Sequence, residues 1–210
     1  DIEYLRKAMA LPKLSLWGMS YGTHLALATV RRHPDSLERV VLMGSEGPDD
    51  TLKLPLAGDA LLADLAVIAK KDGFEDLQGS AQRVLAKLRE QPGQGSSPMH
   101  KGRKVTIGEF DAQMAIAIAL GRRSTQRMLP LALREAEAGN YDLLGAIALM
   151  VREGLGGWRA MPTAMDVASG QSPQRRALAA AQARQSLLGD ALNFPFPEVA
   201  DGLGMLDLGE

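Results

Sequence analysis

One short segment carries residues of the type and spacing that nucleophilic catalysis requires. Gly18-Met19-Ser20-Tyr21-Gly22 matches the pattern G-x-S-x-G, in which a serine sits on a sharp turn between a strand and a helix. The two glycines remove side chains where the chain turns, so the Ser20 hydroxyl can project above a sheet from a strained backbone. The N–H of Tyr21, at the predicted helix start, would face the oxyanion formed when Ser20 attacks a carbonyl. The motif therefore predicts Ser20 as a nucleophile on an elbow completed by Gly18, Met19 and Gly22.

The elements that must position this serine are predicted on both sides of it. The apolar run 14–17 predicts a strand, and 23–32 predicts a helix that ends at His33-Pro34. A second apolar run, 39–43, predicts another short strand. A strand, a turn, a helix and a strand within about 30 residues are typical of a right-handed parallel crossover. This context favours the elbow over the alternative, an ordinary turn of glycine and serine.

The remainder of the sequence predicts mostly helix. Amphipathic helices are expected at 57–71, 79–90, 109–120, 124–138, 141–152 and 174–188. The stretch 91–98 is rich in glycine and serine and indicates a flexible connection, followed by a short strand at 104–107. Ser172-Pro173, a capping residue followed by proline, marks the start of the last helix. The predicted fold class is α/β, with sheet elements in about the first 50 residues and helices in most of the rest.

Several segments together resemble the α/β-hydrolase-fold serine peptidases of the proline iminopeptidase type, including the tripeptidyl-peptidase-like branch. The segments are Leu16–Ala28 with His33-Pro34, Arg39–Gly44, Glu46–Pro55, Ala164–Pro173 and Leu188–Pro197. The resemblance implies that residues 1–50 are part of a hydrolase core sheet with the nucleophile elbow. It further implies a helical cap at 51–200 and a return loop toward the core at 201–210. Such an enzyme would cleave N-terminal residues from small peptides through an acyl group on Ser20, without a metal or an organic cofactor.

The base and the acid of a catalytic triad are not evident in the sequence. In enzymes with this elbow the chain order is serine, then acid, then histidine. His24 lies four residues after Ser20 on the same predicted helix, and His33 beside Pro34 is typical of a helix end. His100 is more distant from Ser20 but follows the glycine- and serine-rich stretch. The sequence begins at Asp1 within a helical rhythm and ends in a loop-like segment. We therefore expect the base and its acid to lie outside this chain, and the chain alone to be inactive.

Acidic residues after the second predicted strand are candidates for substrate binding. Glu46, Asp49 and Asp50 follow the carboxyl end of a parallel strand, the edge where α/β sheets bind ligands. A carboxylate there could bind the N-terminal ammonium of a peptide, and Glu46 is the residue we select. A solvated loop acid is the alternative reading.

Composition limits the other classes of function. Lys and Arg total 24 against 25 Asp and Glu, so no basic field favours a nucleic acid. No apolar run is long enough for a membrane helix, and 46% hydrophobic residues predict a soluble globular chain. The absence of cysteine excludes thiolate chemistry but leaves the compartment and the oligomeric state open. Two alternatives to a peptidase remain: a carboxylesterase acting on small esters, and a non-catalytic helical binding module in which Ser20 is structural.

Overall fold

The computed structural model describes residues 1–97, 102–156 and 160–203. The chain divides into two compact units. We call residues 1–52, 159–177 and 195–210 the elbow unit, and residues 53–158 and 178–194 the helical unit. The boundary at 52/53 lies close to the expected one at 50/51. Of the described residues, 160–177 and 195–200, which we expected within the helical cap, and 201–203, which we expected in its return loop, belong to the elbow unit.

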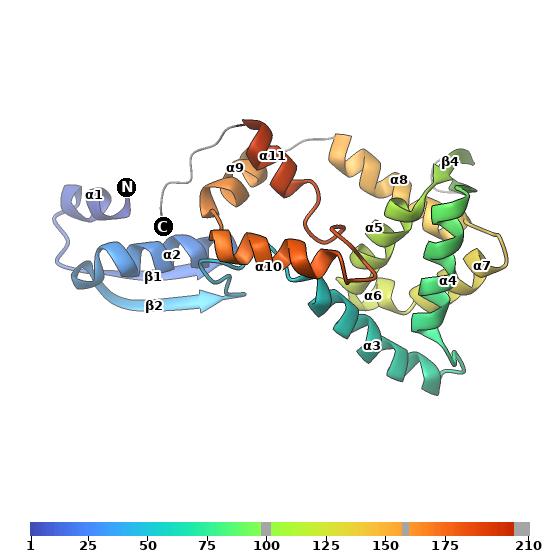
Figure 1. The fold of residues 1–210 in the computed structure, drawn as a ribbon. Helices are drawn as coiled ribbons and strands as arrows, with labels where there is room; N and C mark the ends of the chain where they lie inside the picture. The colour runs from blue at the N-terminus through green and yellow to red at the C-terminus, as the bar shows by residue number, and fades with distance from the viewer. Residues whose placement is uncertain (98–101, 157–159, 204–210) are drawn as a thin grey trace. The chain divides into compact units, whose positions relative to one another are not determined.

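The elbow unit contains the predicted parallel crossover (Figure 1). Its first elements are α1 (Ile2–Ala8), β1 (Leu14–Met19), α2 (Tyr21–Arg32), the 3-10 helix η1 (Pro34–Ser36) and β2 (Leu37–Met43). β1 and β2 are parallel, with Trp17 opposite Val41 and Met19 opposite Met43. α2 packs against both strands. The strands predicted at 14–17 and 39–43 and the helix between them are confirmed, each within a few residues.

The two faces of this small sheet differ in exposure. Leu16, Val40 and Leu42 are half-buried on one face, whereas the opposite face carries apolar side chains that are at least 46% exposed. These exposed side chains are Trp17, Met19, Val41 and Met43. The alternation follows from the two-residue period of a strand, because successive side chains point to opposite faces.

Three further helices contribute to the elbow unit. α9 (Ala160–Ser169) packs against α11 (Phe196–Leu203), and α10 (Pro173–Ala183) begins in this unit. The hydroxyl of Ser172 accepts a hydrogen bond from the N–H of Arg175 at 3.0 Å, which confirms the predicted cap. α10 ends at Ala183 rather than near 188. Residues 201–203, expected to be loop, form the last turn of α11, and 204–210 lie outside the described residues.

The helical unit holds the main hydrophobic core. Its elements are α3 (Pro55–Lys71), α4 (Leu77–Glu90), β3 (Gly93–Ser97), β4 (Arg103–Ile107), α5 (Glu109–Leu120), α6 (Arg123–Gln126), α7 (Leu129–Glu137) and α8 (Asp142–Gly156). α5 is apolar on nearly all sides and packs against α3, α4 and α8. Large side chains that are almost fully buried around it include Leu62, Leu85, Leu88, Leu133 and Leu144. Among the described residues, this core consists of side chains of the helical unit.

Two expectations for this unit were wrong. The helix predicted at 124–138 is split into α6 and α7, and Pro130 lies in the first turn of α7. Proline has no N–H with which to bond the carbonyl four residues earlier, so one continuous helix is disfavoured here. The stretch predicted to be flexible forms β3, which pairs with β4 in an antiparallel hairpin. A Cβ at Gly93 would lie 2.5 Å from the Tyr141 ring, so glycine here allows close packing.

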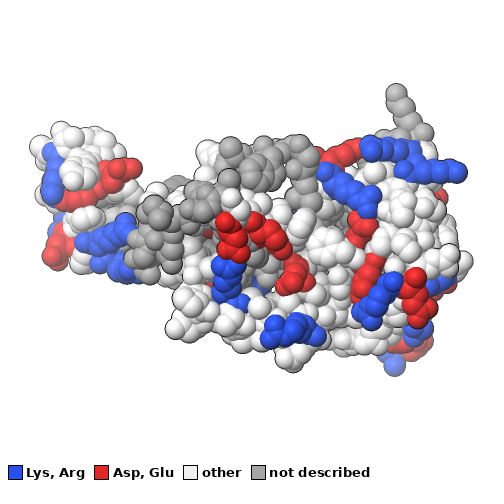
Figure 2. Space-filling model, turned by 45° about the horizontal axis from the view of Figure 1, so that its top comes forward, with Lys and Arg blue, Asp and Glu red and all other residues white. Residues whose placement is uncertain are grey.

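Charged side chains of both signs lie next to one another on the face of the helical unit seen in Figure 2. Ion pairs in this unit include Arg83 with Glu137, Arg89 with Glu109 and Arg152 with Asp111. Taken together, the described residues form a mixed α/β fold that is mainly helical, with one parallel and one antiparallel strand pair. Among the helices within these residues, none has both the length and the apolar character needed to cross a lipid bilayer.

Candidate active site

Ser20 lies at the turn between β1 and α2 with a backbone conformation that is rare for a residue with a side chain. Its φ is +52° and its ψ is −125°. A non-glycine residue in such a region typically costs about 1–3 kcal/mol, which the surrounding structure must offset. Ser20 is also exposed. The expected strained serine between a strand and a helix is confirmed, whereas its chemical role stays a prediction.

A positive φ alone does not mark a site in this protein. Ala10 also has a φ of +52° and lies in the turn after α1, away from any strand-to-helix junction. Ser20 differs because it ends a strand that is paired in parallel and begins a helix of 12 residues. The combination of strain, junction and hydroxyl distinguishes Ser20 from an ordinary strained turn.

The two glycines of the motif have different roles in the structure. A Cβ on Gly18 would lie 2.4 Å from the carbonyl oxygen of Gly22 and 2.9 Å from the nitrogen of Thr23. Only glycine lets the end of β1 approach the first turn of α2 this closely. A Cβ on Gly22 would meet no atom within 4 Å, so the expectation that both glycines are sterically required holds for Gly18 alone. Met19, between Gly18 and Ser20, lies on the exposed face of the sheet.

Hydrogen bonds hold the backbone of Ser20 from both sides. Its N–H donates to the carbonyl oxygen of Met43, at the end of β2, at 3.1 Å. Its carbonyl oxygen accepts from the Thr23 N–H at 2.8 Å and from the Thr23 hydroxyl at 2.7 Å. Tyr21 begins α2, so its N–H is among the first amides, which have no acceptor within the helix. This N–H and the positive end of the helix dipole are available to an anion at Ser20.

Thr23 links the serine to the loop that follows β2. Its hydroxyl accepts a hydrogen bond from the N–H of Glu46 at 2.9 Å, and the residue is completely buried. One side chain thus connects the Ser20 carbonyl to the backbone of Glu46. We did not predict this role from the sequence. The sequence did contain a signal for this role: Thr23 is a polar residue in the first turn of a helix, on the face that packs against the sheet.

Glu46 is half-buried next to this contact. Among the described residues, its carboxylate forms no hydrogen bond or ion pair. A carboxylate held by its backbone close to Ser20, with its acceptor atoms uncommitted, can bind a cationic group of a substrate.

Asp49 and Asp50 hold the loop rather than a ligand. Asp49 accepts hydrogen bonds of 2.6 Å from both the N–H and the hydroxyl of Ser172. Burial raises the pKa of Asp49, but the two bonds from Ser172 and the charge of Arg175 outweigh it and lower that pKa below its ordinary value. Arg175 also donates to the carbonyl oxygen of Leu52 at 2.8 Å and pairs with Asp50 at 3.2 Å. These contacts explain why the start of α10 groups with the sheet.

The histidines do not complete a triad within the described residues. His24 is buried on α2 and stacks on Tyr21, with the ring centroids 6.3 Å apart. His33 ends α2 and is exposed, and His100 lies outside the described residues. In the part of the chain that the structure describes, no hydrogen bond joins the Ser20 hydroxyl to a histidine or a carboxylate. The same part contains no group of three or more acidic or histidine side chains placed to hold a metal ion.

The geometry places Gly18, Ser20, Tyr21, Thr23 and Glu46 together at one end of the parallel strands. Comparison of the chain with protein-family models, with curated proteins and with solved structures gives no match.

Proposed function

We propose that this chain carries the nucleophile elbow of an α/β-hydrolase-fold serine hydrolase, an aminopeptidase similar to proline iminopeptidases. In this proposal the elbow unit is part of the hydrolase sheet and the helical unit is its cap. The observation that carries the proposal is the backbone of Ser20, with φ +52° and ψ −125° at the β1–α2 junction. A serine under such strain, exposed and next to the start of a helix, favours nucleophilic chemistry over a structural turn.

The proposed reaction proceeds through an acyl group on Ser20. The Ser20 oxygen attacks the substrate carbonyl, and its proton passes to a histidine base, which then protonates the leaving amine. The N–H of Tyr21 donates to the oxyanion of the tetrahedral intermediate. Water then releases the acyl group from Ser20. The described residues offer no base in contact with Ser20, so we expect turnover about 10⁴-fold or more below that of a complete triad.

Glu46 supports a substrate with a free amino group. Its N–H is fixed by Thr23, which also holds the Ser20 carbonyl, so the Glu46 carboxylate is anchored in the same part of the elbow unit. An ammonium bound there would orient the first peptide bond of the substrate toward the serine. A carboxylesterase acting on uncharged esters would not need a carboxylate at this position.

Trapping of the acyl group tests the proposal. The chain is incubated with the p-nitrophenyl ester of an amino acid, and peptide mass spectrometry maps the adducts. We expect one acyl group on Ser20, abolished by Ser20→Ala and retained by Ser15→Ala, which removes another exposed serine of the elbow unit. Adducts spread over several residues, or none on Ser20, would contradict the proposal and favour a non-catalytic module.

A second comparison separates the aminopeptidase from the esterase. The same ester is supplied with its amine free or acetylated, and the rates of Ser20 acylation are compared. An aminopeptidase prefers the free amine, and Glu46→Gln removes that preference while Glu38→Gln, an exposed acid on β2, does not. Equal rates for both esters would favour a carboxylesterase.

A further inference from the structure

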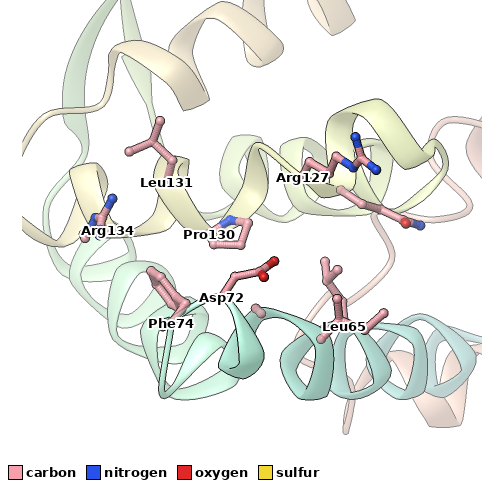
Figure 3. Close-up of a pocket in the computed structure, with 11 residues that line it drawn as sticks. Leu65, Asp72, Phe74, Arg127, Pro130, Leu131 and Arg134 are labelled. Carbon is pink, nitrogen blue, oxygen red and sulfur yellow. The ribbon is translucent and has the colours of Figure 1, made fainter.

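A cavity in the helical unit lies between the end of α3 and the α6–α7 segment (Figure 3). Its volume is about 470 Å³, within the usual range for small-molecule sites. Its apolar walls include Leu65, Phe74, Pro130, Ile68 and Leu131. The last two are 57% and 43% exposed, so apolar surface is left open at the cavity. Exposed apolar surface next to a cavity is typical of a ligand site.

Three charged side chains line the same cavity without pairing. Asp72 comes from the end of α3, while Arg127 and Arg134 come from the opposite side, toward the two ends of the cavity (Figure 3). Within the described residues, none of these three side chains forms a hydrogen bond or an ion pair. Other arginines of this unit, such as Arg83 and Arg89, are bound to carboxylates. A ligand in this cavity could therefore pair with a carboxylate and with a guanidinium group while it contacts apolar side chains.

The position of Asp72 favours a cationic group beside it. Asp72 is the C-terminal cap of α3, whose last carbonyl groups carry the negative end of the helix dipole. Lys70 and Lys71 in the last turn of α3 balance this potential in part, and the Asp72 carboxylate adds to it. A ligand cation at Asp72 would interact favourably with both the carboxylate and the helix end.

We propose that this cavity binds a small zwitterion with an apolar side chain, either a free amino acid or a short peptide. The ammonium group would bind Asp72, the carboxylate would bind Arg127 or Arg134, and the side chain would pack against Leu65 and Phe74. Arginine suits the carboxylate because its guanidinium can donate two parallel hydrogen bonds. All residues that line this cavity belong to the helical unit, and the proposed binding does not require Ser20 to be catalytic.

Isothermal titration calorimetry measures binding to the full chain carrying Ser20→Ala, in which Ser20 cannot react with the ligand. The probes are L-leucine and the dipeptide Leu-Leu, which distinguish an amino acid from a peptide as the ligand. We expect one saturable site for at least one probe. Leucinamide lacks the carboxylate and N-acetyl-leucine lacks the ammonium. Each should bind on the order of tenfold to a hundredfold more weakly, since one charged hydrogen bond contributes about 1.5–3 kcal/mol.

Matched variants locate the site. Asp72→Asn should weaken binding about tenfold or more, while Asp64→Asn, an acid on the same helix outside the cavity, should not. The double variant Arg127→Gln with Arg134→Gln should also weaken binding, and Arg123→Gln, on α6 outside the cavity, should leave it unchanged. NMR chemical-shift changes of backbone amides on titration of the Ser20→Ala chain should concentrate at 65–74 and 126–134. This measurement locates the site without any substitution in the cavity.

The inference is overturned if neither probe binds saturably, or if the shifts fall elsewhere. It is also overturned if the blocked derivatives bind as well as the zwitterions. These outcomes leave the acylation of Ser20 unaffected, so the two proposals fail independently.

Discussion

The two compact units bury their apolar side chains to very different degrees. In the helical unit, Leu133 and Leu144 are completely buried within a continuous core. In the elbow unit, β1 and β2 pair only with each other among the described residues, and one face of the sheet exposes Trp17 and Val41. The helical unit therefore has the burial that gives stability. The residues proposed for chemistry lie in the unit whose sheet leaves apolar side chains exposed.

Amide hydrogen exchange should show the largest difference between the units. We expect slow exchange in α4, α5 and α8, because opening them exposes the core. We expect fast exchange in β1 and β2, since parallel strands are normally buried on both faces and these are not. Slow exchange throughout 14–43 in a sample shown to be monomeric would contradict this.

A pair of truncations tests the same contrast by unfolding. Leu133→Ala should lower the free energy of unfolding of the helical unit by about 2–5 kcal/mol, because it leaves a cavity in the core. Val41→Ala, at a side chain that is 55% exposed, should change stability by about 0.5 kcal/mol or less. Urea titrations followed by circular dichroism measure both. A larger loss for Val41→Ala would mean that its face of the sheet is covered in solution.

Within the elbow, the two glycines of the motif provide a matched pair. Gly18→Ala should destabilise the elbow unit by about 1–3 kcal/mol, because its Cβ would collide with backbone atoms of α2. Gly22→Ala should be neutral, or stabilising by up to about 1 kcal/mol, since the site is open and alanine favours a helix. Thermal unfolding of both variants measures the effect. Similar losses at the two positions would show that Gly22 is also sterically required.

The contact made by Thr23 should have a smaller effect. Thr23→Val keeps the shape but leaves the partly buried N–H of Glu46 without its acceptor, at a cost of about 0.5–1.5 kcal/mol. Thr23→Ser keeps the hydroxyl and should retain most of the stability. Exchange of the Glu46 amide, measured by NMR, should speed up in the valine variant alone. Equal exchange rates of the Glu46 amide in both variants would show that the Thr23 hydroxyl does not hold this amide.

The loop contact of Asp49 should give the smallest effect, and one that depends on pH. Because the folded state lowers the pKa of Asp49, its carboxylate stabilises the fold above the unfolded pKa of about 3.9. That contribution is lost as the pH falls through the lower, folded value. Asp49→Asn should therefore be less stable than wild type at pH 7, with a difference that shrinks below about pH 4. The exposed acid variant Asp35→Asn is the control, and a difference that does not depend on pH would contradict the assignment.

Local signals were sufficient for part of this structure. Apolar runs beside a glycine-rich turn predicted β1, α2 and β2, and Ser172-Pro173 predicted the start of α10. These features depend on residues that are neighbours in the sequence, so a single sequence contains them.

Contacts between distant residues account for what was missed. Gly93 and Gly95 were read as a sign of flexibility. In the structure they allow Tyr141 to pack closely, and this contact could not be predicted because Tyr141 lies more than 40 residues away in the sequence. Thr23 was missed for the same reason, since its partner Glu46 lies 23 positions further along the chain. The open space at Gly22 likewise depends on what surrounds it in the fold.

The central claim, that the strained serine of the elbow is a nucleophile, is tested most directly by a fluorophosphonate probe. Mass spectrometry of the labelled full chain compares the rate of modification at Ser20 with that at the exposed Ser15 and Ser45. We predict that Ser20 is modified first and that Ser20→Ala abolishes this adduct. Equal rates at the three serines, or labelling that spares Ser20, would contradict the claim.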